Sequence, residues 1–390
     1  MCINCLIVNN FDVIGERNAA LFKEVLQSYS WEQAEATVRH ASATDVQRVL
    51  MQEWQSPKTI QDFAVLIAPA AAPFLPEMTR LSQRITRARF GNNIQLYAPM
   101  YLSNECQNIC TYCGFSFTNK IPRKTLTDAE ILQETAILKS YGFDSILLVT
   151  GEHDKLVGID YLLHAVELVK PHFAQVSVEV QPLEQHEYKQ LKNAGVYAVL
   201  VYQETYHRET YKTYHPKGKK SNFDYRLDTP DRLGKAGLYK IGLGVLLGLE
   251  DWRTDSFFNA LHLSYLQSAY WQTKYSVSFP RIRPHEGDFQ PQYLPTEKEL
   301  LQLICAYRIC FPDVELSLST RERAHFRDVV LPYGITSVSA GSKTEPGGYA
   351  ASQALKQFDI DDSRSAAEMA DVIRGMGFEP VWKDWDAVLM

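Results

Sequence analysis

Eight short β-rich runs alternate with helical stretches along this chain, and this alternation limits the possible folds more than any other feature. The runs cover residues 94–98, 145–149, 175–180, 197–202, 240–246, 274–279, 314–318 and 335–339. Amphipathic segments lie between them, and two of these, 127–139 and 296–309, open with capping boxes. Such alternation is typical of repeated βα units and a parallel sheet. Eight units favour an α/β fold of the (β/α)8 TIM-barrel type over an open doubly wound sheet.

Polar clusters follow the runs rather than precede them. In chain order the clusters read NECQNICTYC, TGEH, QPLE, QETYH, GLED, PRIRP, STRE and SAGSKT. They correspond to the loops at the carboxyl ends of the strands, where a barrel places its active site. The sequence therefore predicts one site that is built from several of these loops.

The remaining residues flank the predicted barrel on both sides. Residues 1–93 show helical periodicity without a strand run and are expected to form a helical N-terminal extension. Its helices are expected over 11–29, 31–40 and 44–55. The barrel itself is expected over 94–345. Residues 346–390 form a short C-terminal tail, whose tryptophans, Trp382 and Trp385, predict docking on the barrel.

The composition excludes several classes of protein. Hydrophobic residues make up 45% of the 390-residue chain, and its net charge of −6 argues against a nucleic-acid or anionic-membrane partner. No apolar run reaches the roughly 18 residues of a spanning helix, since the longest, 63–75, is broken by Pro69 and Pro73. A secretory signal is not recognisable, and seven cysteines, an odd number, suit a reducing compartment. We therefore expect a cytoplasmic protein.

Cys106, Cys110 and Cys113 form a Cys-x3-Cys-x2-Cys group directly after the first predicted barrel strand. Structural zinc is usually bound by four protein ligands, whereas this loop offers three. An iron–sulfur cubane held by three cysteines keeps one iron open for a further ligand. Buried free thiols, or zinc completed by a distant histidine, are the alternatives. No chemical role is assigned to the other cysteines, which are Cys2, Cys5, Cys305 and Cys310.

The string YLSNECQNICTYCGFSFTNKIPRKTL around these cysteines resembles the radical S-adenosylmethionine (SAM) superfamily. Within it, the chain is similar to the 2-iminoacetate synthase family, the tyrosine lyases of thiamin thiazole biosynthesis. The likeness continues from about residue 76 to 386 through LLVTGEH, VEVQPL, VYQETYH, KGKK, RLDTPDRLGKAG, KIGLG, YSVSFPR, ELSLSTRE, PGGYA and PVWKDWD. It implies that the three cysteines hold a [4Fe-4S] cluster whose open iron chelates the methionine moiety of SAM.

The resemblance also implies which residues bind SAM. Tyr112 matches the aromatic residue that packs by the adenine, and Gly151 with Glu152 matches an element that receives the ammonium group. Glu179 would accept the ribose hydroxyls, and Arg226 would pair with the SAM carboxylate. The alternatives are chance charges at the barrel rim for the two glutamates and a solvated helix start for the arginine. The glycines of KIGLG suit either a close approach to SAM or tight barrel packing.

For the amino-acid substrate, L-tyrosine, the resemblance implies a carboxylate grip made by Arg321, Ser319 and Tyr101. A buried carboxylate needs a cation and hydroxyl donors beside it. Arg281 and Arg283 are rivals for the cation, and a purely structural pairing of Arg321 with Glu322 or Asp328 is a further alternative. Three polar residues after the fourth run could face the reacting amine or the phenol, namely Gln203, Glu204 and His207.

The implied reaction begins when a reduced cluster passes one electron to SAM. The 5′-deoxyadenosyl radical then abstracts hydrogen from the tyrosine amine, and the Cα–Cβ bond breaks to give 2-iminoacetate and a 4-hydroxybenzyl radical, which ends as p-cresol after it gains an electron and a proton. Reduced flavodoxin or ferredoxin would supply the electron, and thiazole synthase would receive the unstable imine.

Three other functions are compatible with parts of the pattern. The tyrosine lyase of hydrogenase maturation shares this core but carries a second cysteine-bound cluster in a longer C-terminal domain, whereas no cysteine follows Cys310 here. A tryptophan lyase of the same superfamily is the second. A non-catalytic iron–sulfur protein is the third, and it would have no reason to gather Glu152, Glu179 and Arg226 at one barrel mouth.

Overall fold

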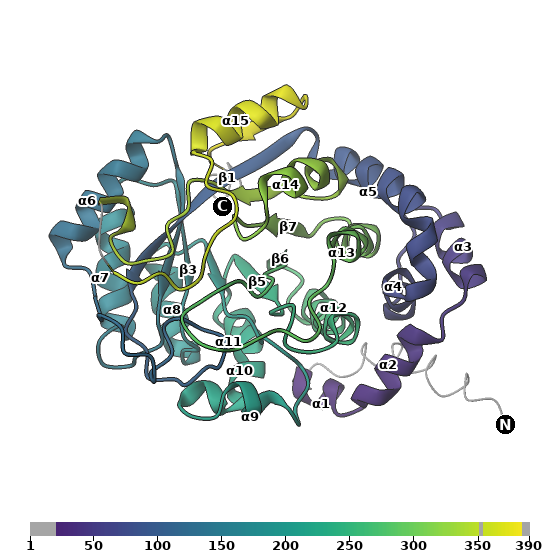
Figure 1. The fold of residues 1–390 in the computed structure, drawn as a ribbon, viewed down its shortest axis with the longest axis horizontal. Coiled ribbons are helices and arrows are strands. Elements are labelled where there is room, and N and C mark those ends of the chain that lie inside the picture. Colours follow the sequence, from purple (N-terminus) through teal and green to yellow (C-terminus); the bar gives the residue numbers. More distant parts are fainter. Residues whose placement is uncertain (1–20, 351–353, 384–390) are drawn as a thin grey trace.

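Eight parallel strands close into a barrel in the computed structural model, which describes residues 21–350 and 354–383. The strands are β1 (Asn93–Ser103), β2 (Ser145–Thr150), β3 (Gln175–Glu179), β4 (Ala198–Leu200), β5 (Lys240–Gly244), β6 (Lys274–Ser278), β7 (Glu315–Leu318) and β8 (Ser337–Ser339). Closure follows because β1 pairs with both β8 and β2. All eight predicted runs are strands, and the predicted (β/α)8 barrel is confirmed (Figure 1).

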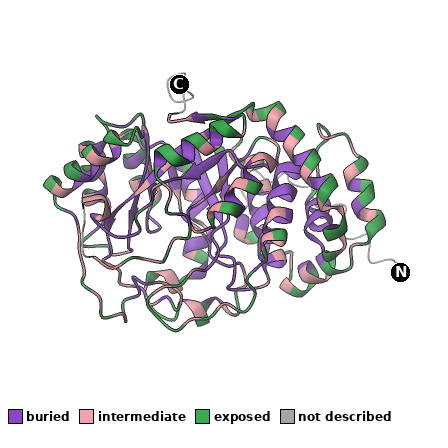
Figure 2. Ribbon diagram, turned by 45° about the horizontal axis from the view of Figure 1, so that its top comes forward, coloured by how far each residue is buried: buried purple, intermediate pink, exposed green. Residues whose placement is uncertain are grey.

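Helices form the outer layer of the barrel, with buried faces toward the strands and exposed faces outward (Figure 2). They are α6 (Asp128–Ser140), α7 (Ile159–Val169), α8 (Gln185–Asn193), α9 (Tyr211–Tyr214), α10 (Phe223–Leu227), α11 (Thr229–Ala236), α12 (Trp252–Ala269), α13 (Glu297–Cys310) and α14 (Ala324–Val330), with short turns η4 (Lys219–Ser221), η5 (Leu331–Tyr333) and η6 (Gly348–Ala350). The capping boxes predicted at the starts of α6 and α13 are present. Among the described residues, no helix combines the length and the apolar character that crossing a membrane requires.

The residues before β1 form helices that pack on one side of the barrel, at the right of Figure 1. They are α1 (Phe22–Leu26), α2 (Trp31–Arg39), α3 (Ala43–Met51), α4 (Ile60–Ile67), η3 (Pro69–Phe74) and α5 (Leu75–Phe90). Helix α4 packs on α12 and α13, and α5 packs on α13. Gln302 of α13 fixes the end of α4, because its Nε2 donates to the carbonyls of Leu66 (2.9 Å) and Ala68 (2.8 Å). Cys2, Cys5 and the first part of the helix expected over 11–29 lie outside the described residues.

After β8 the chain crosses the carboxyl end of the barrel and returns along its outside. It forms α15 (Ala366–Gly375) and a ninth strand, β9 (Glu379–Val381), which pairs in parallel with the start of β1. The sequence analysis did not predict β9. The Trp382 ring then lies 5.5 Å from the ring of Phe143, while Trp385 lies outside the described residues. The domain boundaries after residues 93 and 345 stay predictions.

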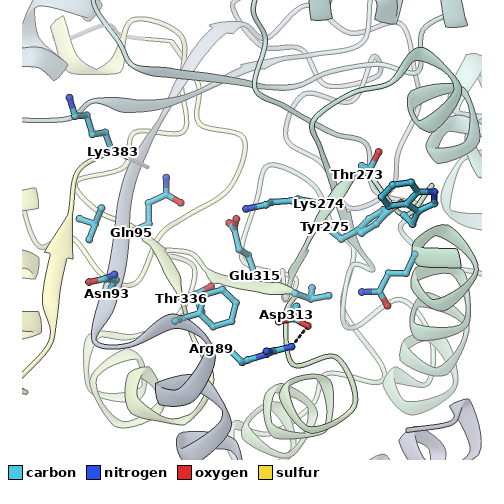
Figure 3. Close-up of a pocket in the computed structure, with 15 residues that line it drawn as sticks. Arg89, Asn93, Gln95, Thr273, Lys274, Tyr275, Asp313, Glu315, Thr336 and Lys383 are labelled. Atoms are coloured by element: carbon cyan, nitrogen blue, oxygen red, sulfur yellow. Dashed lines mark hydrogen bonds and ion pairs between the residues drawn. The ribbon is translucent and has the colours of Figure 1, made fainter. Parts of the chain in front are cut away.

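A cavity of about 910 Å³ lies at the amino end of the barrel, lined by residues such as Asn93, Lys274 and Glu315 (Figure 3). Above it the barrel interior is polar. Lys240 Nζ donates to Glu315 Oε2 at 2.5 Å, and Gln95 donates to the Gln175 side chain at 2.7 Å. The polar clusters of the sequence lie at the opposite, carboxyl end, where the candidate site is found.

Candidate active site

The loop after β1 carries the three cysteines, and Arg123 holds its shape. The Arg123 guanidinium donates to four carbonyl oxygens of the loop, those of Asn104 (2.7 Å), Phe115 (2.8 Å), Ser116 (2.7 Å) and Asn119 (3.2 Å). Each carbonyl would otherwise need another donor, so one side chain satisfies four backbone acceptors of the loop. Arg123 was not expected to have a role, although it lies in the string that carries the family resemblance.

The three cysteines of this loop are free thiols; Cys110 is buried, and Cys106 and Cys113 are half-buried. Burial raises the pKa of Cys106 to about 11 and the pKa of Cys110 well above its usual value, while Lys220 opposes the shift at Cys110. Metal binding would supply the positive charge that thiolates need here.

The donor set fits a cluster held by three cysteines. Within residues 21–350 and 354–383, no three His, Cys, Asp or Glu side chains are arranged so that they could bind one metal ion together. A cubane does not require that arrangement, because each cysteine binds a different iron atom. The loop offers three soft ligands and leaves a fourth iron without a protein ligand.

Gly151 allows the cysteine loop to pack against the end of β2. A Cβ atom at this position would lie 2.1 Å from the Glu105 carbonyl oxygen, so only glycine fits. Next to it, the Gln107 backbone N–H donates to the Glu152 carbonyl at 2.9 Å. The close approach brings the Glu152 side chain beside the cluster loop.

Glu152 lies in a group of alternating charges next to the cysteines. Its Oε1 pairs with Arg226 Nη1 at 2.9 Å, and its Oε2 accepts from Asn108 Nδ2 at 2.7 Å. Lys220 Nζ lies 2.7 Å from Glu204 Oε1. Burial tends to raise the pKa of Glu152, but Arg226 and Lys220 outweigh it and hold this pKa below its usual value. The carboxylate is therefore ionised and can bind an ammonium group.

Arg226 is buried, at 5% exposure, so the alternative of a solvated arginine is wrong. Besides its pairing with Glu152, its Nε donates to the Tyr202 carbonyl at 2.6 Å. Burial works to lower the pKa of Arg226, and Glu152 leads the groups that raise it. A guanidinium held in this way is charged and fixed in orientation.

Gln203 and Glu204 follow β4 at the carboxyl end of the barrel. Both amide atoms of the buried Gln203 side chain lack a hydrogen-bond partner among the described residues. The backbone φ of Glu204 is 71°. Within the described residues, no other non-glycine residue has a positive φ. Backbone strain and unpaired buried polar atoms both mark ligand sites more often than ordinary core.

His207 does not join this group. Its ring stacks on Trp31 of α2 with centroids 4.3 Å apart, and its Nδ1 lies 3.4 Å from Glu250 Oε2. The side chain thus faces the N-terminal helices. The prediction that it could face the amine or the phenol is corrected, because a lone sequence cluster does not show which way each side chain points.

Tyr112, between the last two cysteines, lies beside the same charged group. Its hydroxyl is 2.7 Å from His215 Nε2, and Lys220 Nζ lies 5.7 Å from the centre of its ring. Burial holds the pKa of His215 well below its usual value, so this histidine is neutral. The KIGLG glycines, in contrast, face barrel neighbours: a Cβ on Gly242 would lie 2.4 Å from Leu200, which favours packing.

Arg321, Ser319, Tyr101 and Glu179 line one cavity of about 80 Å³ at the barrel mouth. The Arg321 guanidinium lies 3.4 Å from the centre of the Phe358 ring, and its Nη1 donates to the Arg281 carbonyl at 3.3 Å. Burial lowers its pKa, while Tyr101 and Glu179 act in the opposite direction. No carboxylate within the described residues forms an ion pair with Arg321, so its charge is available to a ligand.

The rival arginines are already paired. Arg281 forms a bidentate ion pair with the buried Glu322, and Arg283 pairs with Asp361. Asp328 in turn pairs with Arg364. The structural alternative, in which Arg321 binds Glu322 or Asp328, is therefore wrong for this structure. Of the three arginines, only Arg321 faces the cavity without an anionic partner in the described chain.

Glu179 gives a prediction for the pH dependence of stability. Burial raises its pKa from 4.5 to about 7, with Arg321 opposing the shift. The folded state therefore binds this proton more tightly, and the associated stability is lost as pH rises from below 4.5 through about 7. Glu179→Gln cannot ionise, so its unfolding free energy relative to wild type should grow by about 2.5 kcal/mol between about pH 5 and pH 8.

Urea unfolding of the cluster-free protein at the two pH values measures this effect. Glu209→Gln, which changes an exposed carboxylate, is the matched control and should show no such growth. An equal free-energy difference at both pH values for Glu179→Gln would contradict the prediction.

Two family models match the chain. The model described as Radical SAM superfamily matches residues 100–261, and the one described as Biotin and Thiamin Synthesis associated domain matches residues 278–379. The chain is 48% identical over 370 residues to the 2-iminoacetate synthase of Escherichia coli (strain K12), covering 94% of this chain and 97% of that protein. It is 47% identical over 370 residues to the 2-iminoacetate synthase of Salmonella typhimurium (strain LT2), and this match also covers 94% of this chain and 97% of that protein.

Among solved structures, HydG, a maturase of the [FeFe]-hydrogenase, is similar with a TM-score of 0.88 and 30% identity. The match covers 94% of this chain and 81% of that chain. The barrel with its cysteine loop and the family match together define a radical SAM enzyme, a class that uses a [4Fe-4S] cluster and SAM. Identity of 48% across nearly the whole length is more specific, and the chain belongs to the 2-iminoacetate synthase family of lyases. The predicted family and cofactors are confirmed.

Proposed function

We propose that this chain cleaves the Cα–Cβ bond of L-tyrosine to give 2-iminoacetate and p-cresol for thiamin thiazole biosynthesis, while SAM yields 5′-deoxyadenosine and methionine. Membership of the family supports the reaction. The observation that carries it in this structure is the cavity at the barrel mouth, where Arg321 lies without a carboxylate partner in the described chain. A free amino acid needs such a cation for its carboxylate.

Cys106, Cys110 and Cys113 would hold the cluster, which supplies the electron that cleaves SAM when it is bound and reduced. Arg123 keeps their loop in one shape through its four bonds to carbonyls. The charged group beside the loop suits the methionine moiety of SAM, because this moiety is a zwitterion. Glu152 would receive its ammonium group, and Arg226 would receive its carboxylate.

The adenosine part of SAM would extend from this charged group toward the cavity. Tyr112 would pack by the adenine, and Glu179 would accept from the ribose hydroxyls. Gly151 serves the packing of the loop, as its close contact with Glu105 indicates. Gln203 and Glu204 would contact SAM or the tyrosine amine, and the unpartnered amide of Gln203 supports a ligand there.

At the tyrosine end, Arg321 would bind the carboxylate with help from Ser319 and Tyr101. Barrel residues and Phe358 of the C-terminal segment line the cavity, and with tyrosine bound they would limit the access of water to the reacting carbon. The protein therefore acts by placing the tyrosine amine beside the radical and by excluding other hydrogen donors.

The choice between tyrosine and tryptophan is tested by anaerobic incubation of the reconstituted enzyme with each amino acid, SAM and a strong reductant. With tyrosine, p-cresol should form. With tryptophan, neither p-cresol nor an indole product should form. Consumption of tryptophan at a rate similar to tyrosine would refute the proposed substrate.

Thiazole synthase is the proposed protein partner, because 2-iminoacetate hydrolyses readily in water and direct transfer protects it. Reduced flavodoxin or ferredoxin is the proposed electron donor, and the cytoplasm is the proposed compartment. The net charge of −6 argues against a nucleic-acid or anionic-membrane partner.

SAM binding should weaken in Glu152→Gln and Arg226→Ala while the cluster still assembles, because both residues act on the charges of the methionine moiety. Loss of one charge-assisted contact costs about 1.5 to 3 kcal/mol, or roughly tenfold to a hundredfold in affinity. Equilibrium dialysis of labelled SAM, with iron analysis of each sample, measures both quantities. Arg208→Ala, which breaks an exposed pair with Asp224, is the matched control. Full SAM affinity in both variants would contradict the placement.

A further inference from the structure

Gln357 contacts both the proposed tyrosine site and a cluster ligand. The Tyr101 hydroxyl donates to Gln357 Oε1 at 2.7 Å, and Gln357 Nε2 donates to Cys113 Sγ at 3.8 Å. An amide oxygen can only accept, so the bond from Tyr101 fixes the orientation of the amide. Its N–H is thereby directed at the cysteine sulfur.

The backbone around Gln357 is held just as closely. The Gly114 N–H donates to the Gln357 carbonyl at 3.2 Å, and the Gln357 N–H donates to the Thr344 carbonyl at 2.9 Å. A Cβ atom on Gly114 would lie 2.7 Å from the same Gln357 carbonyl oxygen, so this close approach requires glycine in the cluster loop. The C-terminal segment, yellow in Figure 1, is thus fitted to the loop that carries the cysteines.

The next residue reaches the other part of the proposed carboxylate grip. The Phe358 ring lies 3.4 Å from the Arg321 guanidinium. Two consecutive side chains of the C-terminal segment therefore contact the two residues, Tyr101 and Arg321, that would bind the tyrosine carboxylate. Occupation of that site by a carboxylate would draw the Tyr101 hydroxyl away from Gln357.

We infer that Gln357 is a positioning residue that couples tyrosine binding to the cluster; the inference rests on the proposed function for the place of tyrosine. Without tyrosine, its N–H faces Cys113 and favours the reduced, more negative cluster. With tyrosine, the Tyr101 hydroxyl donates to the substrate carboxylate, and the freed amide turns its N–H to the Tyr101 oxygen. The cluster loses this bond and becomes a stronger reductant when its substrate is in place.

Four variants separate these contacts. Gln357→Leu removes both hydrogen bonds, whereas Gln357→Glu keeps the size of the side chain and an acceptor for Tyr101 but removes the N–H. Tyr101→Phe removes the hydroxyl through which tyrosine would act. Lys356→Leu changes the exposed neighbouring side chain of the same segment and is the matched control.

The measurement is the ratio of reduced to oxidised cluster at a fixed solution potential, read by EPR on reconstituted protein without SAM. In wild type, saturating tyrosine should lower this ratio about tenfold, which corresponds to ~59 mV for a one-electron couple. Gln357→Leu should start about tenfold lower, and Gln357→Glu, which adds a negative charge beside Cys113, should start at least tenfold lower; neither should respond to tyrosine. Tyr101→Phe should also be insensitive to tyrosine, and Lys356→Leu should behave as wild type.

Tyramine, which lacks the carboxylate, should leave the ratio unchanged, and an equal response to tyramine would overturn the inference. A tyrosine response that persists in both Gln357 variants, or a starting ratio equal to that of wild type in both, would also overturn it. Binding of labelled tyrosine to the same samples separates this result from the proposed function. A wild type that binds no tyrosine would contradict the function, while the starting ratios would still test the contact between Gln357 and Cys113.

Discussion

Replacement of Cys106, Cys110 and Cys113 together by alanine is expected to abolish the [4Fe-4S] cluster and with it all cleavage of SAM. The reason is that these thiols are the three proposed ligands on the loop that Arg123 shapes, and the sequence has no other group of three closely spaced cysteines. Iron analysis and EPR of the reconstituted variant measure the loss. The expected iron content is near zero, and the expected yield of 5′-deoxyadenosine is at the background of an assay without enzyme.

The matched control for this variant is the double replacement of Cys305 and Cys310 by alanine. Both lie buried on α13, where they fill space among apolar side chains. This control should keep its four-iron cluster and its SAM cleavage. A cluster with a SAM-sensitive EPR signal in the triple variant would refute the assignment of the ligands.

Arg321→Ala is expected to lower p-cresol formation by about a hundredfold or more. Some SAM cleavage should persist, because SAM and tyrosine bind to different residues. A substrate carboxylate would be left without its cation in the cavity. Arg321→Lys should rescue little, since a point charge replaces a planar guanidinium that stacks on Phe358 and can donate two parallel bonds to a carboxylate. Quantification of p-cresol and 5′-deoxyadenosine in the same samples separates the two activities.

Arg323→Ala is the matched control, because Arg323 follows closely on the same loop but is exposed and pairs with Glu297 on α13. It should retain p-cresol formation near the wild-type rate. Undiminished p-cresol formation by Arg321→Ala would contradict the proposed carboxylate grip.

Local sequence patterns predicted the strands well and point to the cysteine loop as the place of the cluster, because both depend on neighbours in the chain. The alternation of apolar runs with amphipathic segments determines βα units, and the spacing of three cysteines determines one loop. The start of α6 was predicted from four residues, and its capping box is present. Short-range chemistry is sufficient for features of this kind.

Contacts between distant parts of the chain were not predictable in the same way. Asn108 and Lys220 are 112 residues apart, yet the Lys220 N–H donates to the Asn108 side chain at 3.0 Å. Gln357 is 244 residues from Cys113. No periodicity or spacing rule brings such pairs together, because the path of the C-terminal segment across the barrel depends on tertiary packing. The same limit explains why β9, a strand of three residues outside the barrel, was missed.

Side-chain direction is the second limit. Gln203, Glu204 and His207 lie in one cluster of the sequence, but the backbone at Glu204 adopts a positive φ and His207 turns to Trp31 and Glu250. The family resemblance added the roles of Glu179 and Arg321, which no local pattern distinguishes from other charges after strands. Their shared cavity is a property of the folded barrel.

The central claim is that this chain is a tyrosine lyase of the 2-iminoacetate synthase family, and product analysis of one anaerobic reaction tests it most directly. Reconstituted wild-type protein is incubated with SAM, tyrosine and a strong reductant, and 5′-deoxyadenosine, p-cresol, glyoxylate and carbon monoxide are measured together. We expect p-cresol and glyoxylate, the latter from hydrolysed 2-iminoacetate, in equal amounts, with 5′-deoxyadenosine and without carbon monoxide. Formation of carbon monoxide, or cleavage of SAM without any p-cresol, would contradict the claim.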